Sequence, residues 1–223
     1  MRKRRILICG IVLVFCLVMA WVDGVIQANY FQKSAIKLIL FLVFPAIYAL
    51  YDKQLAIRSL FYPKREGFRL AIPLAVGVYA VILGGYFLCK DVFDFSGITR
   101  SLTENIGVTG SNFLFVSLYI SFVNSLLEEF FFRGFAFLTL QRSVGKRFAY
   151  LFSATAFTLY HIAMMIGWFS IELFLLVLAG LFIGGLLLNY LNDKGQTVYP
   201  SWLVHMFANF AINTIGFVLF GIL

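Results

Sequence analysis

Residues 70–89 read LAIPLAVGVYAVILGGYFLC, twenty consecutive residues without one charged side chain. A helix of about 20 apolar residues is long enough to cross the roughly 30 Å hydrocarbon core of a bilayer. The whole chain has the same character, since 62% of its 223 residues are hydrophobic and 13% are charged. Soluble domains carry about 25% charged residues. We therefore predict an integral membrane protein.

Six further apolar runs accompany this one along the chain. They are residues 6–22, 35–51, 112–140, 148–166, 173–190 and 200–223. Each is close to the length that a membrane-spanning helix needs. The pattern predicts an all-α, polytopic transmembrane helix bundle of about seven spans, or eight if one segment is broken or re-entrant. We interpret residues 1–223 as a single integral membrane domain and residues 91–111 as a simple connector.

The distribution of Lys and Arg predicts the orientation. With a cytoplasmic N-terminus, 14 of the 18 basic residues fall on the inner side, Lys53 among them, or 13 when Arg133 is counted as intramembrane. The outer side then holds Lys33, Lys37, Lys90 and Arg100. Because cytoplasmic loops carry an excess of Lys and Arg, we predict a multi-pass cell-membrane protein with its N-terminus inside. The short chain without an organellar signal suggests a bacterial source.

The basic residues have no nucleic-acid function in this interpretation. They lie in short loops between apolar runs, whereas a nucleic-acid-binding face is a basic surface with interleaved stacking aromatics. We therefore expect no nucleic-acid partner and take the lipid bilayer as the main surrounding.

Two acidic residues lie inside an apolar run. Glu128 and Glu129 interrupt residues 112–140, and an ionised side chain at bilayer depth costs at least ~2.5–3.5 kcal/mol on insertion scales. Glu129 and Arg133 are four residues apart, so they share a helix face and can form an ion pair. Glu128 is rotated by about 100° and is predicted to be the acid left free for chemistry. The alternative is that both acids mark a helix end at the cytoplasmic interface.

The only two histidines also fall in apolar runs. His161 lies in residues 148–166, and His205 is followed by Asn209 one turn later on the same face. A glutamate and a neutral histidine can share the activation of one water as general base. A second histidine and an asparagine can donate hydrogen bonds to a developing oxyanion. This set suits the hydrolysis of an acyl bond, above all a peptide bond.

The same residue types also suit a metal. Glu128, His161 and His205 could hold Zn²⁺, with water in the fourth position. The sequence has no HExxH motif. A histidine that binds a metal usually donates its other ring N–H to a carboxylate or a carbonyl, and the sequence alone does not identify such a partner for either histidine. We therefore expect that no metal or other cofactor is required, with zinc as the alternative.

Three short motifs, in this order, resemble the CAAX-protease and bacteriocin-processing family, also called the Abi family. Its EExxxR motif fits Glu128–Arg133, its FxxxH motif fits Phe157–His161, and its HxxxN motif fits His205–Asn209. The resemblance covers roughly residues 112–213 and implies a multi-helical intramembrane peptidase. It implies a catalytic set of Glu128, His161, His205 and Asn209, supported by Glu129 and Arg133. The first two would activate water, and the next two would stabilise the oxyanion.

The resemblance also limits the substrate. Eukaryotic members of that family remove the last three residues of prenylated CAAX proteins, and prokaryotic members are linked to peptide processing and bacteriocin self-immunity. The family has been described as metalloproteases, whereas a metal-free glutamate mechanism is now often preferred. We expect an intramembrane endopeptidase that acts on a membrane-associated peptide or protein. The alternatives are a non-catalytic immunity or scaffold protein of the same family and a proton-coupled transporter, which the lack of an internal repeat disfavours.

The depths of the two histidines do not match at first sight. At 1.5 Å per residue, His161 lies about 21 Å along its helix from Arg147, and His205 lies about 9 Å along its helix from Tyr199. The two side chains can meet only if a helix is tilted or a loop dips inward.

Overall fold

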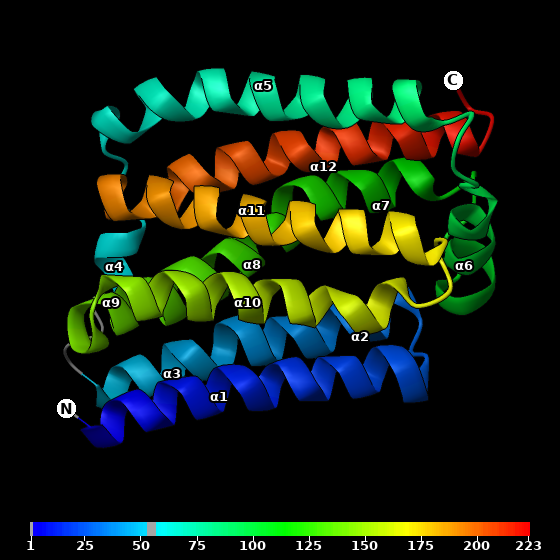
Figure 1. Ribbon diagram of the computed structural model, residues 1–223. Helices are drawn as coiled ribbons and strands as arrows, with labels where there is room; N and C mark the ends of the chain where they lie inside the picture. The colour runs from blue at the N-terminus through cyan, green and yellow to red at the C-terminus, as the bar shows by residue number, and fades with distance from the viewer. Residues whose placement is uncertain (1, 53–56) are drawn as a thin grey trace.

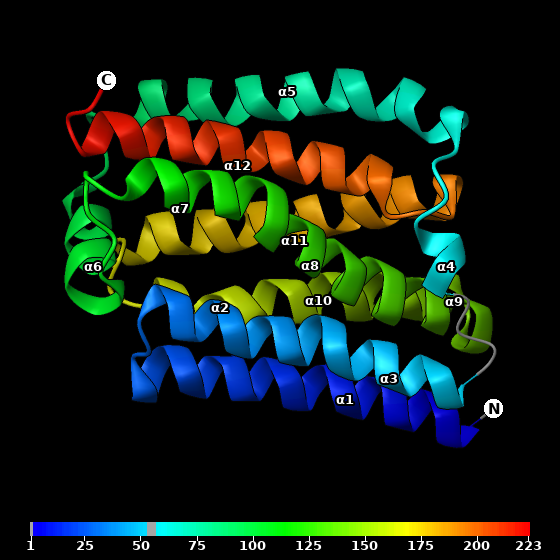
Figure 2. The same cartoon turned by 180° about the vertical axis from the view of Figure 1, so that it is seen from behind.

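The computed structural model describes residues 2–52 and 57–223, so Lys53 lies outside the described residues. Within these ranges the chain forms helices and no strand. Seven helical segments are long and apolar enough to cross a membrane: Lys3–Ile26, Tyr30–Tyr51, Gly67–Cys89, Phe113–Val144, Lys146–Met165, Ile171–Gly195 and Tyr199–Leu219. The predicted all-α polytopic bundle is confirmed. As an odd number of spans requires, the two termini lie at opposite ends of the bundle (Figures 1 and 2).

Several spans combine α-helix with π-helical segments. The first comprises α1 (Arg2–Trp21) and η1 (Val22–Ile26), and the second comprises α2 (Tyr30–Leu38), η2 (Ile39–Val43) and α3 (Phe44–Tyr51). The fourth comprises α7 (Phe113–Tyr119), η3 (Ile120–Asn124), α8 (Ser125–Glu128), η4 (Glu129–Leu138) and α9 (Thr139–Val144). The remaining spans are α5 (Arg65–Cys89), α10 (Lys146–Met165), α11 (Ile171–Gly195) and α12 (Tyr199–Leu219). Two short helices, α4 (Ile57–Leu60) and α6 (Ser96–Ile106), lie at opposite ends of the bundle (Figure 1).

The second span begins earlier than hydropathy predicts because a capping box starts it. The Asn29 side chain accepts a hydrogen bond from the Gln32 backbone N–H at 3.0 Å, and the Gln32 side chain accepts one from the Asn29 N–H at 3.3 Å. These reciprocal bonds satisfy free N–H groups of the first helical turn. As a result Lys33 and Lys37, which the charge count placed outside, lie buried on α2. Lys33 pairs there with Asp23 at 2.6 Å.

The segment 91–111 is not a simple connector, because it contains helix α6. The exposed Asp94 carboxylate accepts the Ser96 backbone N–H at 2.8 Å, and this bond lowers the pKa of Asp94. Gly107, with φ +70°, follows the last turn of α6 in the left-handed conformation that suits glycine. At Gly97 the helix lies so close to the Trp168 carbonyl oxygen that an added Cβ would stand 2.7 Å from it. Helix α6 therefore packs against the turn between α10 and α11.

The turn between α11 and α12 is buried beside α4. Thr197 and Val198 are fully buried. The Leu60 carbonyl at the end of α4 accepts both the Thr197 hydroxyl, at 2.7 Å, and the Val198 backbone N–H, at 3.0 Å. These two bonds hold the turn against α4 at the start of α12. The structure brings the two histidines together despite their different positions along their helices, since both Nε2 atoms lie within 3.9 Å of Glu128 Oε2.

Segment η4 forms the centre of the bundle. All ten of its residues are buried, and a helix enclosed on every side is expected to be apolar all round. Phe131 stacks on Phe41 of η2 with the ring centroids 4.1 Å apart, and Phe132 lies edge-on to Phe157 of α10. Glu128 stands at the midpoint of the span Phe113–Val144. The alternative that the two acids mark a helix end is therefore wrong.

Candidate active site

Glu128, at the end of α8, is buried and held by two donors. Its Oε1 accepts hydrogen bonds from Lys37 Nζ and from Asn124 Nδ2, each at 3.0 Å. Lys37 Nζ also donates to Asn124 Oδ1 at 2.6 Å. The sequence interpretation left Glu128 as the acid without a local counter-charge, and this is wrong, because α2 brings a lysine to it.

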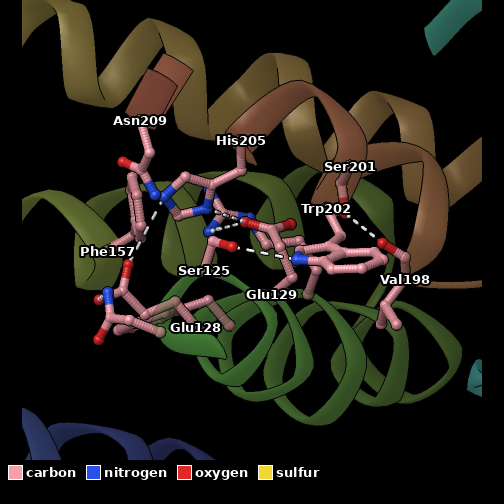
Figure 3. A network of polar contacts seen from close by, with 12 residues as sticks. Ser125, Glu128, Glu129, Phe157, Val198, Ser201, Trp202, His205 and Asn209 are labelled. Carbon is pink, nitrogen blue, oxygen red and sulfur yellow. Dashed lines mark hydrogen bonds and ion pairs between the residues drawn. The ribbon is translucent and has the colours of Figure 1, made fainter. Parts of the chain in front are cut away.

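Glu129 is fully buried beside its predicted partner. Arg133 Nη1 lies 3.1 Å from Glu129 Oε1, so the i,i+4 ion pair expected from the sequence forms. The Arg133 guanidinium also lies over the Phe157 ring, 4.0 Å from its centroid, where cation–π attraction stabilises it. Glu129 makes a second contact across the bundle, since His205 Nδ1 lies 2.8 Å from the same oxygen (Figure 3).

The two imidazoles present the same nitrogen to Glu128. His161 Nδ1 lies 2.7 Å from the Phe157 carbonyl, and His205 Nδ1 lies 2.8 Å from Glu129. Since both partners accept hydrogen bonds, we assign the proton of each neutral imidazole to Nδ1, which leaves a lone pair on Nε2. The Nε2 atoms lie 3.9 Å and 3.8 Å from Glu128 Oε2. Three acceptor atoms on three helices therefore face one point.

Asn209 lies one turn beyond His205 on α12 and packs against η3. Its Nδ2 donates to the Ile120 carbonyl at 3.2 Å, and one turn later Asn213 Nδ2 donates to the Ser117 carbonyl at 3.1 Å. Trp202 Nε1, about one turn before His205, donates to the Phe122 carbonyl at 3.1 Å. These side chains fasten α12 to backbone carbonyls of the fourth span, and the Ser117 and Ile120 carbonyls also accept backbone N–H groups. An amide nitrogen carries two N–H groups, so Asn209 retains one for another acceptor.

The structure thus brings together five of the six site residues that the sequence predicts and places Asn209 beside them on the helix that carries His205. Reasoning from the sequence missed Lys37. Its signal was present, because Lys37 falls within the apolar run 35–51 and a lysine at bilayer depth needs a partner. The charge count assigned it to the outer side because the start of the second span was drawn too late.

The donors fit a divalent metal in type. Among residues 2–52 and 57–223, no group of three or more His, Cys, Asp or Glu side chains is arranged as a metal centre. The nearest arrangement is Glu128 Oε2 with the two Nε2 atoms. The Phe157 carbonyl and the Glu129 carboxylate are second partners of the kind that zinc-bound histidines use, so the sequence argument that none could be assigned is wrong. Against a metal, Lys37 already supplies Glu128 with a positive charge and would repel a cation nearby.

Residues 110–211 match the model of a family described as type II CAAX prenyl endopeptidase Rce1-like. This segment is similar to the Rce1-like family. The match covers a little under half of the chain, from α7 into α12, and contains all three motifs. It confirms the resemblance to the CAAX-protease and bacteriocin-processing family. Neither the curated proteins nor the solved structures give a significant match to the chain.

At the level of the family, the Rce1-like segment and the seven apolar helices indicate an intramembrane peptidase in a multi-pass membrane protein. Helix α2, which contributes Lys37 to Glu128, lies outside the Rce1-like segment. The site is thus assembled from that segment and from the N-terminal part of the chain.

Proposed function

We propose that this protein is an intramembrane endopeptidase that hydrolyses peptide bonds of membrane-associated peptides or proteins with an activated water. The observation that supports the proposal is the convergence of Glu128 Oε2 with the Nε2 atoms of His161 and His205, within 3.9 Å and at the centre of an apolar bundle. Such a group of acceptors can orient a water and take its proton.

In the proposed reaction, Glu128 and His161 share the general-base step. A water between Glu128 Oε2 and His161 Nε2 gives up a proton as its oxygen attacks the scissile carbonyl carbon. The Phe157 carbonyl fixes the His161 ring by accepting its Nδ1–H, so the Nε2 lone pair stays aimed at the water. The proton then passes to the amide nitrogen as the C–N bond breaks, which regenerates the base.

His205 and Asn209 are proposed to stabilise the oxyanion. Because His205 Nδ1–H is bonded to Glu129, its Nε2 can donate only after the ring takes up a second proton from solvent, and the Glu129 carboxylate beside it favours that imidazolium. Asn209 contributes the amide N–H that Ile120 does not use. Arg133 pairs with the Glu129 carboxylate, so Glu129 and Arg133 support the site without touching substrate.

The proposed reaction requires no resident metal. If the protein takes up zinc, the residues that would hold it are Glu128, His161 and His205. A metal bound there would supply Lewis-acid activation of the water and of the carbonyl. The reaction steps above use only side chains of this chain.

The proposed substrate class is a membrane-associated peptide or protein. The name of the matched family refers to prenylated CAAX proteins. For this chain the proposal extends to peptides that reach the bilayer, because the described site is built from groups that act on a peptide bond.

The test compares the peptides released from membranes that contain the protein with those released by two variants. Glu128→Gln removes the proposed base, and Glu172→Gln removes an exposed acid in the first turn of α11, outside the three motifs. Mass spectrometry of new peptide termini is expected to show the same cleavages with wild type and Glu172→Gln and none with Glu128→Gln. Identical termini with and without the Glu128 carboxylate would overturn the proposal.

A further inference from the structure

Lys37, Asn124 and the proposed base Glu128 are all hydrogen-bonded to one another. Its Nζ lies 3.0 Å from Glu128 Oε1 and 2.6 Å from Asn124 Oδ1, and Asn124 Nδ2 donates to the same Glu128 oxygen at 3.0 Å. The ammonium also lies 5.1 Å from the centroid of the Tyr160 ring. Lys37 is only 5% exposed, so these contacts replace water around it.

This group orients the carboxylate. Both donors engage Oε1, so the other oxygen, Oε2, is left facing the two imidazole nitrogens at 3.8 Å and 3.9 Å. A carboxylate on a glutamate side chain can otherwise rotate about its terminal torsion, which is broad. The Lys37 and Asn124 bonds restrict that rotation and keep Oε2 at the point where the water is activated.

Lys37 also balances the charge of the site. Each buried glutamate has one cation, Lys37 for Glu128 and Arg133 for Glu129, while both imidazoles are neutral in the assigned tautomers. Two adjacent carboxylates in an apolar bundle would repel each other strongly without these partners. The second cation is intrinsic to the EExxxR motif, whereas the first comes from outside the matched segment 110–211.

Lys33 provides a natural comparison one turn earlier on the same helix. It is equally buried and forms an ion pair with Asp23 at 2.6 Å. This pair joins α2 to η1, and Asp23 is not one of the residues that gather around Glu128. Lys33 and Lys37 therefore share residue type, helix and burial but differ in their partner.

We propose, on the basis of the peptidase function proposed above, that Lys37 is a positioning residue of the active site, which holds the Glu128 carboxylate in the orientation that activates water. Helix α2 is then part of the catalytic apparatus, and the Rce1-like segment alone is an incomplete enzyme. Misplacing a catalytic group by about 1 Å can reduce the rate about 100-fold.

The experiment measures kcat, KM and thermal unfolding of the full-length protein with a peptide that wild type cleaves. Lys37→Met is expected to lower kcat about 100-fold, counted per folded molecule, while KM stays within about threefold. Lys37→Arg, which keeps the charge, is expected to have a kcat at least tenfold higher than that of Lys37→Met. Lys33→Met is expected to lower thermal stability to a similar extent as Lys37→Met and to leave kcat per folded molecule within about threefold of wild type.

The outcomes separate the two proposals. If wild type cleaves and Lys37→Met keeps kcat within threefold, Lys37 is a structural residue only and this inference fails while the peptidase function stands. Equal losses of kcat in Lys33→Met and Lys37→Met would also show that Lys37 has no specific role at Glu128, and this inference would fail while the peptidase function stands. If Lys37→Met does not fold, Lys37→Gln, which keeps an N–H donor and removes the charge, is judged by the same threefold limit. If wild type shows no cleavage that depends on Glu128, the peptidase function itself fails and this inference fails with it.

Discussion

The buried pair Glu129–Arg133 allows a quantitative prediction. Both side chains have no exposed surface, and the ion pair measures 3.1 Å. In Glu129→Gln, the amide oxygen still accepts the His205 Nδ1–H, but the charge opposite Arg133 is lost. Removing one partner of a buried ion pair costs about 3–5 kcal/mol because the remaining charge stays buried. The hydrogen bond to His205 is retained, and the Phe157 ring still stabilises the Arg133 charge. We therefore expect the free energy of unfolding to fall by the lower end of this range, about 3 kcal/mol.

The assay is equilibrium unfolding in mixed micelles, followed by circular dichroism. A loss of about 3 kcal/mol corresponds to more than a hundredfold change in the folding equilibrium constant, since each 1.4 kcal/mol is about tenfold. The double variant Glu129→Gln/Arg133→Met removes both charges and should be more stable than Glu129→Gln alone. A change below about 0.5 kcal/mol in Glu129→Gln, or a double variant whose loss is the sum of the two single losses, would refute the reasoning.

Three further predictions concern topology, metal and packing. A reporter inserted after residue 62 should be cytoplasmic and one inserted in segment 91–111 external, as the basic residues predict; the reverse result would overturn the orientation. Active protein should contain no stoichiometric metal on elemental analysis, whereas one zinc per chain that is lost and restored together with activity would contradict the metal-free mechanism. Gly216→Ala should destabilise by about 1–3 kcal/mol, because its Cβ would collide with the Phe113 ring. Gly180→Ala, where the added atom meets no neighbour within 4 Å, should be tolerated, and equal effects at both sites would contradict this packing.

The spans could be predicted because the bilayer fixes the length of an apolar run. The starts of helices depend instead on local hydrogen bonds. The second span begins at Tyr30 because Asn29 and Gln32 form a capping box. Both residues are visible in the sequence, but a hydropathy count does not detect a capping box. Helix α6 is a similar case, with Asp94 bonded to Ser96 at its start and Gly107 at its end.

The sequence could single out most of the residues that meet in the candidate site, but little of the geometry in which they meet. Helical spacing correctly paired Glu129 with Arg133, because that contact lies within one helix. The meeting of His161 with His205 at Glu128 depends on how α10 and α12 pack around α8, which is a tertiary arrangement without a local pattern. The partner of Glu128 depends on how α2 packs against α8, and no periodicity within either helix reveals it.

The most direct test of the proposed mechanism is the single-turnover rate of purified Glu128→Gln on a peptide that wild type cleaves. Glutamine preserves the shape and can still accept the bonds from Lys37 and Asn124, but it cannot take a proton from water. Circular dichroism is measured in parallel to show that the variant is folded and inserted. We predict that the folded variant cleaves no detectable peptide. Turnover at the wild-type rate by folded Glu128→Gln would contradict the assignment of Glu128 as the base.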